Sequence, residues 1–130
     1  MRTLLWIFAL LSAANGLWML LAPESWYLHL PAGVPDTGPF NHHFVQDIGA
    51  AYLTAGAAFA GGALRPQYRQ AVLLAAALFY TLHALVHVAD LLVGRLRRGH
   101  WMLDLPGVFL PAIILLVLCL PTWRRQRDGG

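Results

Sequence analysis

The sequence has no lysine, one cysteine and few charged residues. Charged side chains make up 12% of its 130 residues, whereas a soluble domain has about 25%. The single cysteine, Cys119, has no second thiol in the chain, so an internal disulfide is excluded. All nine basic residues are arginines, and they stand at the ends of apolar runs instead of forming one basic stripe. This distribution argues against nucleic-acid binding.

The sequence is rich in long apolar stretches. Hydrophobic residues make up 58% of it, and the mean hydropathy is +0.58. Four stretches approach the about 20 residues that cross the hydrocarbon core of a bilayer. We expect helices at about residues 3–22, 44–64, 70–98 and 104–123. The sequence therefore predicts an all-α integral membrane protein, with residues 1–130 forming one domain, an antiparallel bundle of four transmembrane helices.

The distribution of arginine predicts the orientation of this bundle. Arginine favours the cytoplasmic side of a membrane, and a cytoplasmic N-terminus places six of the nine arginines there. We therefore expect both termini in the cytoplasm. The free use of Arg, Ala, Gly and Pro indicates a GC-rich bacterial genome, and hence the inner membrane. Ser12-Ala13-Ala14 would also suit signal-peptide cleavage, but the apolar run continues through "LWMLLA", so we favour a retained helix.

Ionisable residues interrupt the third apolar stretch, within "FYTLHALVHVADLLVG". His83, His87 and Asp90 are spaced i, i+4 and i+7, so on a helix they lie within about 60° of one another. Ionisable side chains inside membrane spans are rare and mark functional sites. Asp90 lies near the negative end of its helix and therefore needs a cation. Protonated histidine, a metal ion and Arg97 are the candidates.

A second polar stripe lies on the stretch that begins at residue 44. His43, Asp47 and Thr54 fall within about 40° of one another on a helix. The same stretch, "GAAYLTAGAAFAGGA", is dense in the small residues that let membrane helices pack closely. Packing of the second helix against the third would bring Asp47 to the level of His87 and Asp90.

The predicted topology gathers most acids and histidines at the outer membrane face. Tyr80 extends the stripe of the third helix inward, and His100 and Asp104 precede the fourth helix at the outer face. Asp104 stands directly before "LPGVF", so we expect it to cap the fourth helix. Asn41 is expected to cap the second helix in the same way.

A metal site is the leading interpretation of these residues. Imidazoles at i and i+4 can bind one ion, and ligands of N/O type suit zinc, iron, manganese or copper(II). Such a site could serve an oxidoreductase that acts on a hydrophobic substrate or electron carrier. "HALVH" lacks the glutamate of the metalloprotease motif. The expected ligands are Asp47, His83, His87, Asp90 and His43, and the supporting polar residues are Thr54, Tyr80, His100, Asp104 and Arg97.

Two other interpretations stay open. A b-type haem could be held between histidines of two helices. Alternatively, the chain is a non-enzymatic, transporter-like or accessory subunit. Its histidines and acids would then form a structural network or a proton relay, or bind a quinone or a lipid headgroup. In that case the small-residue face of the second helix would mediate homo-oligomerisation.

The order of the apolar stretches and two local motifs also resemble a known group of proteins. These motifs are "APESWY", where the first stretch ends, and "GPFNHHFVQDIGAAYL", where the second begins. Together with the layout, they resemble the small four-helix bacterial membrane proteins called DoxX-like. The resemblance implies a membrane bundle with a redox or accessory role, and it assigns no catalytic residue.

Overall fold

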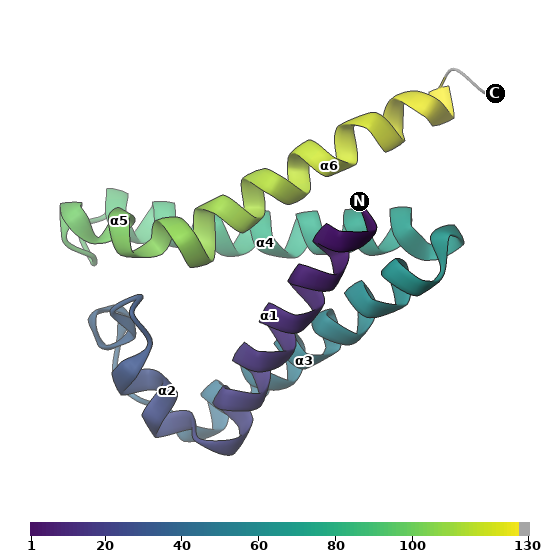
Figure 1. Cartoon of the computed structure of the whole chain (residues 1–130). Helices are drawn as coiled ribbons and strands as arrows, with labels where there is room; N and C mark the ends of the chain where they lie inside the picture. The colour runs from purple at the N-terminus through teal and green to yellow at the C-terminus, as the bar shows by residue number, and fades with distance from the viewer. Residues whose placement is uncertain (128–130) are drawn as a thin grey trace. The chain divides into compact units, whose positions relative to one another are not determined.

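The computed structural model describes the backbone of residues 1–127 and the side chains of residues 1–120 (Figure 1). Helices make up 87% of it, and the described residues contain no strand. The prediction of an all-helical chain is confirmed. The first part of the chain contains α1 (Arg2–Leu21), α2 (Pro23–His29), the 3₁₀ turn η1 (Val34–Thr37), α3 (His42–Leu64) and the 3₁₀ turn η2 (Pro66–Tyr68). The second part contains α4 (Arg69–Leu92), the 3₁₀ turn η3 (Arg98–His100), α5 (Trp101–Asp104), the π-helix η4 (Leu105–Phe109) and α6 (Leu110–Arg127).

Three helical segments among the described residues are long and apolar enough to cross a membrane. They are Arg2–Leu21, Pro66–Leu92 and Arg98–Leu120. Helix α3 has 23 residues but is not among them, because its many small residues, with His42, His43 and Asp47, contribute little hydropathy. Three helices of membrane-spanning character are thus found, and a fourth span stays a prediction.

The chain divides into two compact units, Met1–Arg69 and Gln70–Gly130, called unit 1 and unit 2 below. Unit 1 contains α1 to η2, and unit 2 contains α4 to α6. The prediction that residues 1–130 form one domain concerns how the two units join, and it stays a prediction. Each unit is described by itself.

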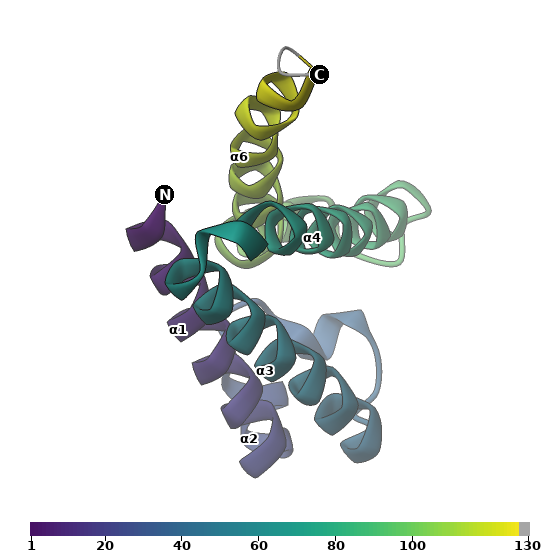
Figure 2. The same ribbon diagram turned by 90° about the vertical axis from the view of Figure 1, so that its right-hand side faces the viewer.

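Unit 1 is held together by close packing of α1 against α3, which lie side by side (Figure 1, Figure 2). A Cβ atom on Gly16 would lie 2.6 Å from the carbonyl oxygen of Gly49 and 2.7 Å from the amide nitrogen of Leu53. A Cβ on Gly56 would lie 3.0 Å from the amide nitrogen of Ala13. The two backbones therefore touch, and the helices run in opposite directions. The small residues of α3 do allow close packing, and within unit 1 they pack against α1.

Side-chain hydrogen bonds fix the connection between α1 and α3. The indole of Trp26 donates to Asn15 Oδ1 at 2.9 Å, and the Gln46 amide donates to the carbonyl oxygen of Leu20 at 3.0 Å. The Tyr27 hydroxyl donates to the carbonyl oxygen of Gly38 at 2.8 Å. These bonds tie α2 to α1, α3 to the end of α1, and the following loop to α2.

Asn41 caps α3 as expected. Its Oδ1 accepts a hydrogen bond from the backbone N–H of Phe44 at 3.0 Å. Because such a bond satisfies one of the free N–H groups at a helix start, we expect Asn41→Ala to lower the free energy of unfolding by about 1 kcal/mol. Thermal unfolding in detergent, followed by circular dichroism, measures this. Asn41→Ser keeps an acceptor and should unfold like the native protein; an equal loss in both variants would contradict the capping role.

Unit 2 departs from the expected helix boundaries at both sides of its loop. Helix α4 ends at Leu92 instead of residue 98, because Gly94 adopts a positive φ of 76°. The N–H of Gly94 then donates to Leu91 and that of Arg95 to the carbonyl oxygen of Asp90, the bonding pattern of a Schellman motif. The chain becomes helical again by Arg98, before the expected residue 104.

Candidate functional site

A buried carboxylate lies between two imidazoles in unit 2. Nδ1 of His87 is 3.0 Å from Oδ2 of Asp104, and Nε2 of His100 is 3.5 Å from Oδ1 of the same residue. The side chains of Asp104 and His100 are each 1% exposed, and that of His87 is 16% exposed. These three residues, here called the His–Asp network, come from α4, from η3 and from the end of α5.

The local fold explains why Asp104 faces the imidazoles. His100 and Asp104 are spaced i, i+4 on a continuous helical path, so they share one face. Asp104 has helical φ and ψ of −74° and −23° and makes no side-chain capping bond. The prediction that it caps the fourth helix is therefore wrong. The helix has already begun at Trp101, so no free helix start remains at residue 104.

The contacts among these three side chains are close but are not aligned as hydrogen bonds. Among the residues described, His87 Nδ1 and both Asp104 oxygens have no hydrogen bond of good geometry, although they lie in close contact. An isolated carboxylate is very costly to bury, and a protonated imidazole supplies the compensating charge. The contact between His87 and Asp104 is an ion pair whenever the imidazole is protonated.

His83 extends the network by one turn along α4. Its ring centroid is 4.8 Å from that of His87, with the rings edge to face, and it stacks on Phe79 with the planes 5° apart. Tyr80, expected as a supporting residue, is buried on the same helix. The structure thus places two of the expected metal ligands, His83 and His87, side by side.

Asp90 lies outside this network. Its Oδ1 accepts a hydrogen bond from Nη1 of Arg95 at 2.8 Å, and the Arg95 side chain is 76% exposed. Arg95, which is not among the expected cations, therefore pairs with Asp90. The turn at Gly94 folds Arg95 back over the end of α4. Arg97 is exposed, and its carbonyl oxygen accepts a bond from the N–H of His100.

The expected residues of unit 1 form contacts within α3. His43 Nε2 lies 3.4 Å from Asp47 Oδ2, with the side chains 86% and 64% exposed. The hydroxyl of Thr54 donates to the carbonyl oxygen of Ala50 at 2.9 Å. The predicted approach of Asp47 to His87 would join the two units, and it stays a prediction.

The side-chain geometry does not form a ready-made metal site. In the described part of the chain, no group of three or more His, Cys, Asp or Glu side chains is arranged to hold a metal ion. Within the His–Asp network, the two imidazole nitrogens approach different oxygens of Asp104. The expected set of His83, His87 and Asp90 is divided by the pairing of Asp90 with Arg95.

One sequence signal for this site was available. "HWMLD" repeats the i, i+4 spacing of His43/Asp47 and His83/His87, and its aspartate, Asp104, is the buried acid of the network.

Comparison of the chain with protein-family models, curated protein sequences and solved structures gave no match. The site is therefore interpreted from its own chemistry.

Proposed function

We propose that the chain is an integral membrane protein whose His–Asp network binds and relays protons near one membrane face. It would act as a transporter-like or accessory subunit. The observation that carries this proposal is the carboxylate of Asp104, 1% exposed and in contact with two imidazoles. Imidazole gains and loses a proton near neutral pH, and acids and histidines within spans commonly form proton relays.

Stepwise transfer through Asp104 would use both of its contacts with imidazole. His87 Nδ1 faces one carboxylate oxygen and His100 Nε2 faces the other. Asp104 can accept a proton from one imidazole and, after rotation about its Cβ–Cγ bond, pass it to the other. His83, whose ring lies against that of His87, would extend this path along α4.

The same proposal includes the arrangement in the membrane. Three helices of sufficient length and apolarity support membrane insertion. With α3 as a fourth span, the chain would form an antiparallel four-helix bundle in a bacterial inner membrane. Six of nine arginines favour cytoplasmic termini. A DoxX-like kinship and a homo-oligomer are compatible with this layout and rest on the sequence motifs alone.

Proton flux into liposomes tests the relay. Purified protein is reconstituted into vesicles that contain a pH-sensitive dye, and a pH step is applied with valinomycin and potassium to balance charge. We expect the native protein to pass protons faster than empty vesicles do. Asp104→Asn and His87→Gln should each return the flux to that of empty vesicles, because each variant removes one proton-carrying side chain from the path.

Asp47→Asn is the matched control. Asp47 also pairs with a histidine at i, i+4 but is exposed, so its loss should leave the flux unchanged. Circular dichroism and gel filtration check that each variant is folded. Native protein that conducts no better than empty vesicles would refute the relay, as would equal flux in folded Asp104→Asn protein.

Metal binding is the second candidate, because two imidazoles and a carboxylate, all N/O ligand types, already meet in unit 2. A bound zinc, iron, manganese or copper ion would then serve an oxidoreductase. Elemental analysis of detergent-purified protein should show near-stoichiometric metal that is lost in the His87→Ala, His100→Ala double variant. An absorption spectrum tests haem in the same sample, since a bound haem gives a Soret band.

A further inference from the structure

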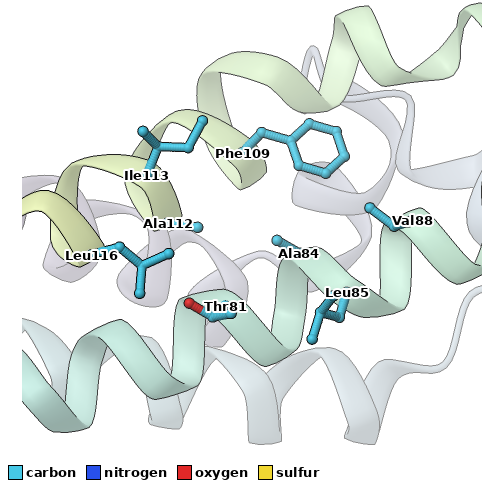
Figure 3. Close-up of a pocket in the computed structure, with 8 residues that line it drawn as sticks. All are labelled: Thr81, Ala84, Leu85, Val88, Phe109, Ala112, Ile113 and Leu116. Carbon is cyan, nitrogen blue, oxygen red and sulfur yellow. The ribbon is translucent and has the colours of Figure 1, made fainter.

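The loop that joins α4 to α5 within unit 2 lies between two segments of membrane-spanning character. The segment Pro66–Leu92 ends just before this loop, and the segment Arg98–Leu120 begins at its end. Away from the loop, apolar side chains and Thr81 line the space between α4 and the η4–α6 segment (Figure 3). If both segments cross the bilayer, residues 93–98, here called the arginine loop, lie among the lipid headgroups.

The arginine loop carries more positive charge than negative charge at its surface. Its three exposed arginines are Arg95, Arg97 and Arg98. Leu96 lies between them and is buried, so it anchors the loop and leaves its neighbours outside. The nearest acids in the sequence are Asp90, which pairs with Arg95, and Asp104, which is buried in the His–Asp network. Residues 91–103 contain no acid, so one exposed carboxylate stands against three guanidinium groups.

Exposed apolar side chains flank the arginine loop on both sides. Leu92 precedes it, and Trp101 and Met102 follow it, all with their side chains exposed. Tryptophan is enriched at the level of the lipid headgroups. A surface that carries guanidinium groups beside apolar side chains can contact the phosphate and the acyl chains of one lipid together. This combination favours a phospholipid over a soluble anion as the ligand.

We propose that the arginine loop binds the phosphate of an anionic phospholipid, chiefly through Arg97 and Arg98. The planar guanidinium group matches two phosphate oxygens, and each basic residue beside an anionic bilayer strengthens binding by about fivefold. Arg95 contributes less because it already pairs with Asp90. The inference rests on the membrane arrangement proposed above and does not depend on the proton relay.

Native mass spectrometry of the full-length protein in detergent tests the lipid site. The protein is titrated with phosphatidylglycerol, which is anionic, and separately with phosphatidylcholine, which has no net charge. We expect the native protein to bind its first phosphatidylglycerol more tightly than phosphatidylcholine. The Arg97→Gln, Arg98→Gln double variant should bind that first phosphatidylglycerol about 25-fold more weakly, because each arginine contributes about fivefold.

The Arg2→Gln, Arg65→Gln double variant is the matched control. It removes the same charge, because both arginines are exposed, but it does so in unit 1. It should bind the first phosphatidylglycerol as tightly as the native protein does. Glycerophosphoglycerol, the same headgroup without acyl chains, should not displace the lipid when added at an equal concentration. Circular dichroism checks that each variant is folded.

Three results would overturn the proposal. They are equal affinity of the native protein for the two lipids, equal weakening in both double variants, and displacement of the lipid by glycerophosphoglycerol. The second result would reflect net charge alone, and the third would indicate a site for a soluble phosphate ester. The proposed function fails by other readouts, since proton flux tests the relay and native protein that stays in solution without detergent would refute the membrane arrangement.

Discussion

Replacing Gly16 with alanine is expected to lower the free energy of unfolding by about 2–3 kcal/mol. The new Cβ would lie 2.6 Å from the carbonyl oxygen of Gly49 and 2.7 Å from the amide nitrogen of Leu53. Both neighbours are backbone atoms, so no side chain can rotate away and α1 must shift from α3. Overpacking of this kind typically costs 1–3 kcal/mol. Unfolding in a detergent series, followed by circular dichroism, measures the change.

Gly61→Ala provides the matched control in the same unit. Gly61 lies in α3, and a Cβ built on it meets nothing within 4 Å. Because alanine is favoured over glycine in a helix by about 1 kcal/mol, this variant should be as stable as the native protein or more stable. Equal stability of Gly16→Ala and Gly61→Ala would contradict the close packing of α1 and α3.

Apolar stretches together with boundary residues predicted where α1 and α3 lie. The expected residues 3–22 and 44–64 match Arg2–Leu21 and His42–Leu64 within two residues, because Pro23 and Asn41 mark clear boundaries. The expected end of α4 at residue 98 is wrong, since the helix ends at Leu92. Apolar residues continue through Leu92 and Val93, so hydropathy does not mark this end. There the helix ends through the positive φ of Gly94, and nothing in hydropathy marks that glycine as a turn.

The site was only partly predictable for a related reason. The i, i+4 spacing brings His83 to His87 and His100 to Asp104 on their own helices. The contact of His87 with Asp104 joins two helices, so it depends on how α4 and α5 pack. The prediction that Asp104 caps the fourth helix is wrong, although "DLP" has the local pattern of a helix start. Likewise, Thr54 and Thr81 look alike in sequence, yet only one has a bonded hydroxyl.

The ion pair between His87 and Asp104 gives the second large expected effect. Where the imidazole is protonated, Asp104→Asn should lower the free energy of unfolding by about 3 kcal/mol, because removal of one partner of a buried ion pair leaves the other charge buried. In His87→Gln, Asp104 keeps His100 at 3.5 Å, so the loss should be smaller. The exposed pair of His43 and Asp47 is the control, and Asp47→Asn should cost less than about 1 kcal/mol.

A double-mutant cycle distinguishes the ion pair from two independent contributions. If His87 and Asp104 stabilise the fold through each other, the double variant loses less than the sum of the single losses, by about 1–3 kcal/mol. Additive losses would show that His100 alone stabilises the buried carboxylate of Asp104. His87 would then not be part of the relay. The same cycle on His43 and Asp47 should give a coupling near zero, because water already solvates both exposed side chains. The size of the coupling thus measures whether burial makes the contributions of His87 and Asp104 to stability depend on each other.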